Sequence, residues 1–474
     1  MSDAIQLDSI ICGEKVSTAE SLSVFNPYNN AEVGSVGLVD AETAVQMIER
    51  TSSFPSRLTR FQRSEILTTV RQKLLDEQEL FIDLISRESG LCVRETRYEV
   101  SRAADVLYFA SMEALKDDGQ IFSCDVTPNG KPRKIFTTRE PVSLALAITP
   151  FNHPLNQVAH KIAPAIAAGV PMMLKPSEKT PLTAIRFAEL FFEAGLPGEM
   201  LSVFLAPIPE VIEPMISDER VELVTFTGGT SVGKRIAKTA GYKKLCLELG
   251  GNSPLLILRD ADLDLAANLA AEGCFRNSGQ RCTAVKRILV DASIKTGFVD
   301  RFLKKAETYR VGDPADPETI VGTVIDEEAA KVLESRIHSA VDEGATVLLG
   351  GNRQGAQLEP TVIDNVSRKS EMICKESFGP LAPILTFENL DDAITLANQS
   401  DFGLSSGVVT NDMQAALDCV KRIRTGTVNI NQVPGYRIEC SPFGGVKDSG
   451  LGIKEGVIEA MKYMTNVKTF SLPW

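Results

Sequence analysis

The segment KLCLELGGNSPLLIL, residues 244–258, decides the fold of this chain. It contains an apolar run typical of a buried strand, then two glycines, and then a second run of the same kind. Strands of this kind that alternate with helices predict a parallel sheet with helices on both faces. We therefore expect two α/β domains that meet near Gly250.

Similar apolar runs continue on both sides of this segment. Toward the amino terminus we expect strands at residues 142–149, 171–174, 201–206, 221–227 and 244–249. Toward the carboxyl terminus we expect strands at residues 254–258, 287–290, 346–350, 381–387, 405–410 and 427–430. Helical stretches separate several of these runs. The sequence thus predicts an α/β fold with two doubly wound parallel-sheet domains.

Two segments fit neither domain core. RKIFTTRE, residues 133–140, and VKTFSLPW, residues 467–474, indicate a small β arm and a final strand that pair with another subunit. The expected division gives a first domain of residues 1–122 and 142–248 and a second domain of residues 249–440. The oligomerisation arm and the carboxyl-terminal segment then comprise residues 123–141 and 441–474.

The composition narrows the class of protein. The 474 residues are 43% hydrophobic and carry a net charge of −12, which argues against non-specific binding to nucleic acid or anionic membranes. We see no secretory signal and no apolar run of about 20 residues, and we expect a cytoplasmic protein. Nine scattered cysteines favour free thiols in a reducing compartment, and three histidines without metal-type spacing predict no metal site.

Cys282 is the candidate nucleophile. It lies in NSGQRCTA, residues 277–284, a small polar stretch with Arg281 directly before the cysteine. A free thiol has a pKa of about 8.5 and is only slightly ionised at neutral pH. The neighbouring arginine either assists the thiol or binds the molecule that the thiol attacks. The other eight cysteines are expected to be inert core residues.

Two further residues carry groups that thiol chemistry needs. Glu248 is a lone carboxylate in an apolar strand, and burial raises the pKa of such a group so that it can act as a general base. A glutamate satisfied by a salt bridge is the alternative. Asn152 ends an expected strand and offers an amide N–H to an oxyanion, although Asn-His-Pro is also common in turns.

The stretch FTGGTSVGKR, residues 226–235, follows one expected strand and opens a helix. Gly228 to Lys234 matches the spacing of a phosphate-binding loop, but Arg235 replaces the Ser or Thr that holds magnesium. A nucleoside triphosphatase is therefore disfavoured. The small residues still allow backbone N–H groups to face a phosphate, and an ordinary strand-to-helix turn is the alternative.

Together these segments resemble the aldehyde dehydrogenase superfamily from about residue 20 to the end. LELGGNSP, with Glu248, is similar to the general-base motif of that family, and NSGQRC, with Cys282, is similar to its nucleophile motif. The resemblance implies that the first domain binds NAD and that the second is the catalytic domain. It also implies an oxyanion hole formed by Asn152 and the backbone N–H of Cys282.

The resemblance further implies a set of cofactor-binding residues. They are Thr149, Pro150, Lys175, Glu178, Gly228, Gly229, Gly233, Leu249, Glu376 and Phe378. In this assignment Lys175 and Glu178 hold the adenosine ribose, and Glu376 and Phe378 position the nicotinamide riboside. An acidic side chain at position 178 repels a 2′-phosphate, which favours NAD over NADP, with NADP use left open.

The implied chemistry is oxidation of an aldehyde to a carboxylate. The Cys282 thiolate attacks the aldehyde carbon, hydride leaves from the thiohemiacetal to the nicotinamide, and a thioester results. Glu248 then activates the water that hydrolyses this thioester. An inactive structural homologue or an enzyme that acylates coenzyme A is the alternative, and the presence of both Cys282 and Glu248 argues against these two.

Five residues stand at positions where this family usually lines its substrate tunnel. They are Arg102, His153, Arg281, Thr283 and Arg437. Four basic groups in an acidic chain predict a local anion pocket, and unrelated surface charges are the alternative. A phosphonate or a phosphate could bind several of these groups, because arginine offers forked donors.

Two segments narrow the substrate further. GQRCTAVKRILV, residues 279–290, and IECSPFGGVKDSGLG, residues 438–452, resemble members that oxidise phosphonoacetaldehyde to phosphonoacetate. Non-phosphorylating oxidation of glyceraldehyde 3-phosphate is the first alternative, since those members share the arginine before cysteine but usually have tyrosine where His153 stands. Succinate semialdehyde and lactaldehyde are more distant alternatives. By analogy, the arm implies a homodimer or homotetramer.

Overall fold

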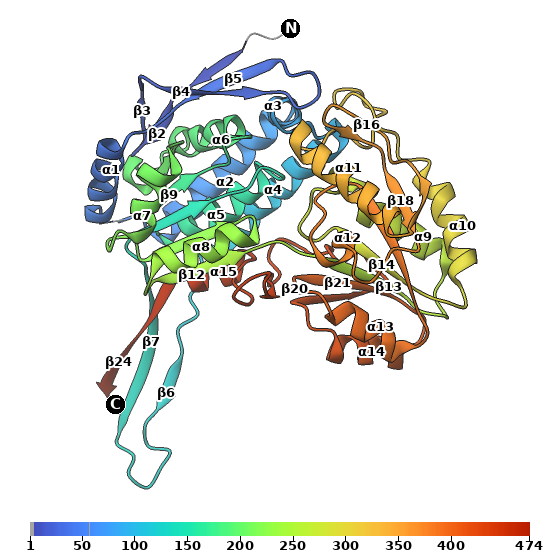
Figure 1. The fold of residues 1–474 in the computed structure, drawn as a ribbon. Coiled ribbons are helices and arrows are strands. Elements are labelled where there is room, and N and C mark those ends of the chain that lie inside the picture. The colour runs from blue at the N-terminus through green and yellow to red at the C-terminus, as the bar shows by residue number, and fades with distance from the viewer. Residues whose placement is uncertain (1–3, 56) are drawn as a thin grey trace.

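The computed structural model describes residues 4–55 and 57–474 of the chain (Figure 1). Two seven-stranded sheets with their helices form two lobes, and a long β arm extends from the first lobe. The predicted α/β fold class, with two doubly wound sheets and a β arm, is confirmed. Each of the predicted strands overlaps a strand of the structure.

The first sheet has the order β12-β11-β8-β9-β10-β2-β3. Its strands are β12 (Lys244–Glu248), β11 (Leu223–Thr227), β8 (Ala145–Ile148), β9 (Met172–Lys175), β10 (Leu201–Val203), β2 (Ser9–Ile11) and β3 (Glu14–Val16). The first five run parallel, whereas β2 and β3 are antiparallel additions at one edge. This edge corrects the expectation of a purely parallel sheet, because three-residue strands are too short to give a recognisable periodicity.

Helices cover this sheet, and the first four of them account for most of residues 41–114. They are α1 (Ala41–Ser53), α2 (Arg60–Asp76), α3 (Gln78–Ser89), α4 (Val93–Ala114), α5 (Asn156–Ala168), α6 (Leu182–Glu193), α7 (Glu213–Ser217) and α8 (Thr230–Ala240). A reciprocal capping box between Thr59 and Gln62 starts α2. A separate three-stranded sheet near the amino terminus contains β1 (Ile5–Leu7), β5 (Glu32–Gly37) and β4 (Ser21–Phe25).

The second sheet has the order β15-β18-β19-β14-β13-β21-β22. Its strands are β15 (Thr346–Leu349), β18 (Thr361–Asp364), β19 (Leu381–Phe387), β14 (Val285–Asp291), β13 (Ser253–Ile257), β21 (Ser405–Val409) and β22 (Thr427–Ile430). Only the edge strand β15 is antiparallel to its neighbour. Two short antiparallel pairs accompany it, β16 (Arg353–Gln354) with β17 (Gln357–Leu358) and β20 (Phe402–Gly403) with β23 (Val446–Lys447).

Six α-helices surround the second sheet. They are α9 (Leu263–Phe275), α10 (Lys295–Ala306), α11 (Glu327–Asp342), α12 (Glu371–Cys374), α13 (Leu390–Asn398) and α14 (Met413–Arg422). Phe275, Phe298 and Phe302 stack between α9 and α10 and are fully buried. This packing fixes α9, whose carboxyl end leads to Cys282.

The arm consists of β6 (Ile121–Ser123), β7 (Arg133–Pro141) and β24 (Thr465–Pro473), in the order β24-β7-β6. It therefore begins at Ile121, two residues before the expected boundary. Residues 441–464 are not part of it, because α15 (Val457–Tyr463) packs against α4 and α5 in the first lobe. Figure 1 shows the arm projecting away from both lobes.

The topology brings several strand ends to one edge of the first sheet. Strands β8, β9, β11 and β12 run parallel, so their carboxyl ends meet there, and such edges hold ligands in open α/β sheets. Across the described ranges, 4–55 and 57–474, no helix has the length and apolarity needed to cross a membrane. The same ranges contain no group of three His, Cys, Asp or Glu residues that could share a metal ion.

Candidate active site

Cys282 lies in a tightly held loop, residues 276–282, which we call the nucleophile loop. Its residues 277–279 all have left-handed backbone conformations, with φ of 57°, 51° and 69°. Such conformations are uncommon outside glycine. A Cβ on Gly279 would overlap the carbonyl oxygen of Gly379, so only glycine fits there. The loop therefore holds Cys282 in one defined position.

Asn152 connects the first lobe to this loop. Its Nδ2 donates a hydrogen bond to the carbonyl oxygen of Gln280 at 2.8 Å. Asn277 Nδ2 in turn donates to the carbonyl oxygen of Asn152 at 3.1 Å. Asn152 and Cys282 also line the same cavity. The two residues expected to form an oxyanion hole are thus brought together across the boundary between the lobes.

Lys286 lies buried beneath the nucleophile loop and was not among the predicted residues. Its Nζ donates to the carbonyl oxygen of Gly279 at 2.7 Å and lies 5.0 Å from the centre of the Phe378 ring. Burial lowers the pKa of Lys286 to about 8, and nearby Glu376 opposes this effect. Lys286 therefore links the loop that carries the thiol to the segment of Glu376 and Phe378.

A first cavity, of about 270 Å³, opens on one side of Cys282. We call it the glycine-side cavity, and it is lined by Pro150, Phe151, Asn152, Gln157, Thr227, Gly228, Gly229, Glu248, Leu249, Gly250, Cys282, Glu376 and Phe378. Most of these residues are apolar or glycine, and the charged ones are two carboxylates. The predicted nucleophile, base and oxyanion donor therefore share one cavity with much of the predicted cofactor site.

Glu248 enters this cavity from the end of β12. Both of its carboxylate oxygens are buried, and neither has a hydrogen-bond partner among the described residues. Burial, and then the charge of Glu455, raises the pKa of Glu248 well above its usual value. Glu455 itself forms a buried ion pair with Lys161. The salt-bridge alternative for Glu248 is therefore excluded within the described residues, and the carboxylate is suited to accept a proton near neutral pH.

The glycines of the predicted turn differ in their roles. Gly229 is the N-cap of α8, without a side-chain cap, and a Cβ there would meet open space. The first turn of α8 thus leaves backbone N–H groups free for an anion. Gly233, in contrast, packs directly on Leu249, which leaves no room for a Cβ. Gly233 therefore lets the helix approach the strand and does not line the cavity.

Three other predicted cofactor residues lie outside the glycine-side cavity. Lys175, the last residue of β9, forms an ion pair with Glu178, and neither residue lines that cavity. Burial lowers the pKa of Lys175, and Glu178 opposes this effect. Thr149 is buried at the end of β8. Glu178 lines a separate cavity with Lys179, next to the amino-terminal sheet.

A second cavity, of about 180 Å³, opens on the other side of Cys282, and we call it the arginine-side cavity. All five predicted substrate residues line it, namely Arg102, His153, Arg281, Thr283 and Arg437. Arg276 lines it too and was not predicted; it is held by Glu95 and Glu272. The predicted basic residues therefore converge on one cavity, as an anion pocket requires.

Two of these arginines keep unused donors. Arg281 Nη2 donates to the carbonyl oxygens of Glu272 and Gly273, at 2.9 and 3.0 Å, at the end of α9. Its buried Nε has no partner among the described residues, and neither has Nη1 of Arg437. The Arg437 guanidinium lies 3.9 Å from the centre of the Phe443 ring. Such unsatisfied buried donors are costly unless a ligand accepts from them.

Arg102 has a different environment, because Glu439 holds it in an ion pair. Glu439 also accepts a hydrogen bond from His160 Nε2 at 2.6 Å and lies 4.0 Å from Arg437. Burial alone would raise the pKa of Glu439, but His160, Arg102 and Arg437 together lower it. His153 Nδ1 similarly lies 3.3 Å from a buried carboxylate, that of Glu99. Buried acids therefore fix these two basic side chains at the cavity wall.

The surroundings of the thiol distinguish Arg281 from Arg437. Burial raises the pKa of the Cys282 thiol to about 12, and the charges of Glu376 and Glu248 add to this rise. Arg437 is the arginine that opposes it most. Arg281, although adjacent in sequence, points its guanidinium toward the end of α9. Arg281 is therefore better placed to meet a ligand than to ionise the thiol.

The site defines a class of protein. A cysteine stands between two cavities, with an unpaired carboxylate on one side and a cluster of arginines on the other. Such a constellation suits an enzyme that forms a covalent intermediate on sulfur and releases it with an activated water. A thiol-dependent dehydrogenase of aldehydes combines these parts with a fold built to hold a dinucleotide.

Comparison with known proteins gives the family. The model of the aldehyde dehydrogenase family matches residues 15–470. A 3-sulfolactaldehyde dehydrogenase from Priestia aryabhattai is 38% identical, over 97% of this chain and 96% of the relative. A sulfoacetaldehyde dehydrogenase from Neptuniibacter caesariensis is 34% identical, over 95% of this chain and 99% of the relative. The chain belongs to the aldehyde dehydrogenase family.

Solved structures agree with this assignment. An NAD-dependent aldehyde dehydrogenase from Sinorhizobium meliloti has a TM-score of 0.95 and 30% identity, covering 99% of this chain and 95% of that one. A glyceraldehyde-3-phosphate dehydrogenase from Methanocaldococcus jannaschii, complexed with NADP, has a TM-score of 0.91 and 35% identity, covering 96% and 99%. The family thus includes users of either cofactor.

Proposed function

We propose that this chain oxidises a small aldehyde bearing a phosphonate or related tetrahedral anion, with NAD or NADP as the hydride acceptor. The observation that carries this proposal is the arginine-side cavity. Arg281 and Arg437 have unpartnered donors there, beside Cys282. A bound oxyanion would accept from both arginines, and charge-assisted hydrogen bonds of this kind are strong.

The residues divide the chemistry between them. We assign the attack on the aldehyde carbon to the Cys282 thiolate, and the binding of the developing oxyanion to the Asn152 amide and the backbone N–H of Cys282. A bound nicotinamide cofactor supplies the hydride acceptor. Glu248 then takes a proton from the water that hydrolyses the thioester. The position of Cys282, in the walls of both cavities, supports this division.

The cofactor assignment rests on the glycine-side cavity. The uncapped first turn of α8 and the open space at Gly229 fit the pyrophosphate, and Glu376 and Phe378 fit the nicotinamide end. Glu376 is anchored because it accepts from the backbone N–H of Gly251 at 2.9 Å. Glu178 disfavours a 2′-phosphate by its charge, so we propose NAD as the preferred cofactor, with NADP also accepted.

Phosphonoacetaldehyde remains the first proposed substrate. Its dianionic head suits two free arginine donors, and a cavity of about 180 Å³ limits the substrate to a few carbons. Sulfoacetaldehyde or 3-sulfolactaldehyde is the second candidate, because the two relatives described above carry those names. A sulfonate has the same tetrahedral shape but only one negative charge. The phosphonate and sulfonate groups therefore differ in charge but have nearly the same size.

Steady-state kinetics can test this proposal directly. We expect the highest kcat/KM for phosphonoacetaldehyde, followed by sulfoacetaldehyde and 3-sulfolactaldehyde. Glyceraldehyde 3-phosphate, succinate semialdehyde, lactaldehyde and neutral propanal complete the panel. Equal kcat/KM for propanal and the anionic aldehydes would refute the anion pocket, and a preference for the sulfonates would replace the phosphonate as the head group.

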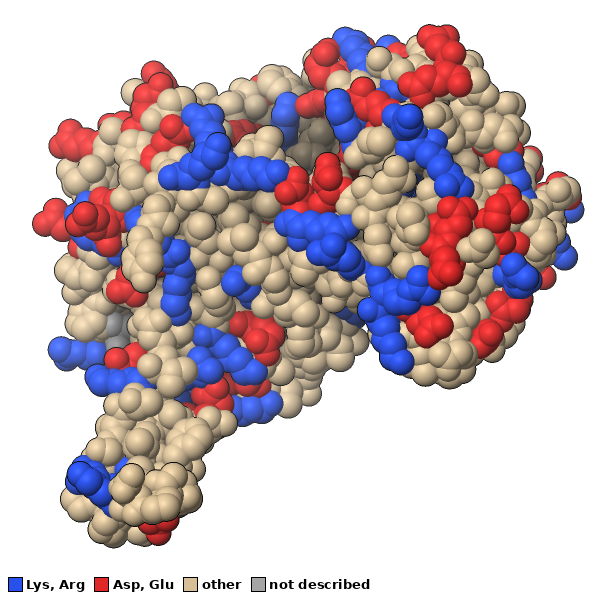
Figure 2. All heavy atoms as spheres, turned by 60° about the horizontal axis from the view of Figure 1, so that its bottom comes forward, with Lys and Arg blue, Asp and Glu red and all other residues tan. Residues whose placement is uncertain are grey.

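We further propose a cytoplasmic homodimer or homotetramer that associates through the arm. Exposed apolar side chains on the edge strand β24 support this assembly: Val467, Phe470, Leu472 and, directly after it, Trp474. Figure 2 shows that few charged side chains lie on the tip of the arm that faces the viewer. An exposed apolar strand edge favours pairing with another chain. Sedimentation analysis of the purified protein gives the number of copies.

A further inference from the structure

A pocket of about 250 Å³ lies at the root of the arm, far along α4 and α5 from Cys282. We call it the arm-root pocket. Five basic residues line it, namely Arg60, Arg63, Lys116, Arg139 and Lys462, against two acidic ones, Glu113 and Asp118. Figure 2 shows basic and acidic side chains close together near the base of the arm. None of these residues belongs to the active site described above.

Ion pairs account for four of the five cations. Arg60 pairs with Asp117 at 3.2 Å and Arg139 with Asp118 at 2.6 Å. Lys116 and Lys462 pair with Glu113 and Glu459, at 2.8 and 2.9 Å. Four of the cations have a local structural role that requires no ligand.

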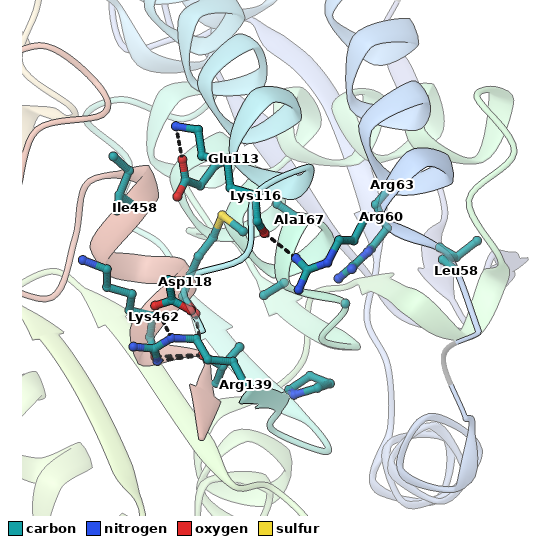
Figure 3. Close-up of a pocket in the computed structure, with 15 residues that line it drawn as sticks. Leu58, Arg60, Arg63, Glu113, Lys116, Asp118, Arg139, Ala167, Ile458 and Lys462 are labelled. Atoms are coloured by element: carbon teal, nitrogen blue, oxygen red, sulfur yellow. Dashed lines mark hydrogen bonds and ion pairs between the residues drawn. The ribbon is translucent and has the colours of Figure 1, made fainter. Parts of the chain in front are cut away.

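Arg63 is the exception. Its guanidinium forms no hydrogen bond or ion pair with the described residues, and its Nε is buried. Burial, and then the charge of Arg60, lowers the pKa of Arg63. In Figure 3 the side chains of Arg60 and Arg63 extend from the first turn of α2. Two neighbouring cations, one of them without a counter-ion, are unfavourable until an anion joins them.

The end of α5, next to Arg63, has small residues that leave room for this guanidinium. The residues at the end of α5 are Ala167, Ala168 and Gly169, and all three line the pocket. A Cβ on Gly169 would lie 2.7 Å from Arg63 Nη1. Gly169 has a φ of 84° and closes α5, which is a common use of glycine on its own. The small residues therefore leave space for the pocket, and the charge of Arg63 makes the pocket favour an anion.

We propose that the arm-root pocket binds a small multivalent oxyanion of the phosphate type, with the Arg63 guanidinium as its main ligand. The free fork of Arg63 suits two oxygens of one tetrahedral group. The pocket is smaller than the usual site for a drug-sized ligand, which favours inorganic phosphate or a short phosphorylated metabolite. This site is additional to the proposed substrate pocket and does not depend on it.

The position of the pocket gives the bound anion a role. Helix α4 carries Arg102 at the arginine-side cavity and ends beside the pocket, and α5 begins at Asn156, next to the catalytic residues, and ends at the pocket. With a rise of about 1.5 Å per residue, α5 spans about 20 Å between the two sites. An anion at Arg63 would therefore brace the helices that support the active site.

Titration of inorganic phosphate into the purified full-length protein tests this proposal, with calorimetry at constant ionic strength. Arg63→Met should weaken one class of phosphate sites at least about tenfold. The matched control is Arg71→Met, which removes an arginine from the same helix but not from the pocket. Phosphate bound at the active site contributes equally to both variants. Equal phosphate affinity in the two variants would overturn the proposal.

Thermal unfolding separates ligand binding from a purely structural role. Phosphate should raise the midpoint of the wild-type protein and of Arg71→Met, but should raise that of Arg63→Met less. Without phosphate, Arg63→Met should unfold at or above the wild-type midpoint, because an unpartnered cation is removed. A lower midpoint with an unchanged response to phosphate would make Arg63 a helix cap. Arg63→Lys should respond between the two, because it keeps the charge without the fork.

Sedimentation of the same variants excludes a different occupant. A carboxylate from a second copy of the chain could fill the pocket in the assembly. In that event Arg63→Met would change the number of copies in the particle and leave phosphate binding unaltered, which contradicts the proposal. We expect the same sedimentation for wild type, Arg63→Met and Arg71→Met. Dehydrogenase activity without phosphate should also be unchanged, since Arg63 lies outside the catalytic site.

Discussion

The two cavities on either side of Cys282 differ in charge. The glycine-side cavity has mostly apolar and glycine walls, with the carboxylates of Glu248 and Glu376 as its charged groups. The arginine-side cavity has four arginines and a histidine in its wall, together with two carboxylates, Glu95 and Glu272. The thiol thus has carboxylates as the charged groups on one side, and more cations than carboxylates on the other.

This difference separates reactivity from recognition. The carboxylates add to the effect of burial in raising the pKa of the Cys282 thiol, and Arg437 opposes them. Arg281 is not among the charges that act most on the thiol, and its buried Nε has no partner among the described residues. Adjacent positions in a sequence can therefore serve opposite ends of a substrate, and a distant arginine can be the one that assists the nucleophile.

Cys282→Ala should have the largest effect. Because the thiol is the proposed nucleophile, its loss should lower kcat for every aldehyde at least about a thousandfold. Binding of NAD, measured by calorimetry, should be little changed. Cys274→Ala, a buried cysteine in α9 that lines neither cavity, is the control. Substantial turnover by Cys282→Ala would disprove the covalent route.

Replacing the two arginines should show how far recognition is separate from reactivity. Arg281→Met should lower kcat/KM for anionic aldehydes about 10- to 100-fold, the loss expected for one charged hydrogen bond, and leave propanal nearly unaffected. Arg437→Met should lower kcat/KM for both kinds of aldehyde, because Arg437 also favours the thiolate. If the two variants affect propanal equally, this separation is wrong. Arg301→Met on α10 is a surface control.

The pH dependence follows from the glycine-side carboxylates. The pKa values of Glu248 and Cys282 are both raised, and both groups act in their ionised forms. Their active forms therefore increase as the pH rises, and kcat/KM for propanal should increase from pH 6 to 9, by up to about tenfold per unit. Propanal is used because it does not titrate. A rate that falls over this range would contradict these roles.

Lys286→Met tests the hydrogen bond that Lys286 donates to Gly279 beneath the nucleophile loop. Loss of the bond to Gly279 should loosen the nucleophile loop and lower kcat/KM about fivefold to tenfold for all aldehydes. The pKa of Lys286, lowered to about 8, means that the unfolded chain binds more protons between pH 8 and about 10. Wild type should therefore gain stability over this range relative to Lys286→Met. If wild type and Lys286→Met differ in thermal midpoint by the same amount at pH 7 and at pH 10, this prediction is wrong.

Glu178→Gln should have the smallest effect. Removing this half-exposed charge should improve kcat/KM with NADP relative to NAD by about threefold, because solvent screens the interaction. Glu42→Gln on α1, also exposed, is the control. An unchanged cofactor ratio would mean that Lys175 already neutralises Glu178. The choice between NAD and NADP would then depend on other residues.

Local sequence patterns predicted the main strands, and the three proposed catalytic residues were singled out by such patterns together with the family resemblance. Most of the long apolar runs became buried strands, whereas the edge strands β15 and β22 are only partly buried. Asn152 and Glu248 came together because the parallel strands of the first sheet share one carboxyl edge. Cys282 reaches the same cavity from the second lobe, in the loop before β14, and the three residues line it together. Strands β1 to β3 were missed because three residues cannot establish a period.

The buried acids and lysines could not be predicted from local patterns. Glu439 binds His160, and Glu455 binds Lys161, across almost 300 residues of sequence. A lone charge at such a position looks like any surface residue until the fold supplies its partner. Lys286 follows Cys282 by four residues, but only the contact with Gly279 reveals its position below the loop. For Gly233, proposed from the resemblance as part of the cofactor turn, only the fold reveals the close packing on Leu249.

The carboxyl-terminal segment contributes both to the surroundings of Glu248 and to the arm. Glu455 lies within the catalytic charge network, and β24 begins ten residues later as the edge of the arm. The last residue, Trp474, packs under the ammonium group of Lys134 on β7. The end of this chain is therefore a poor place for a purification tag, because a bulky fusion there would disturb the arm and, through α15, reach the active site.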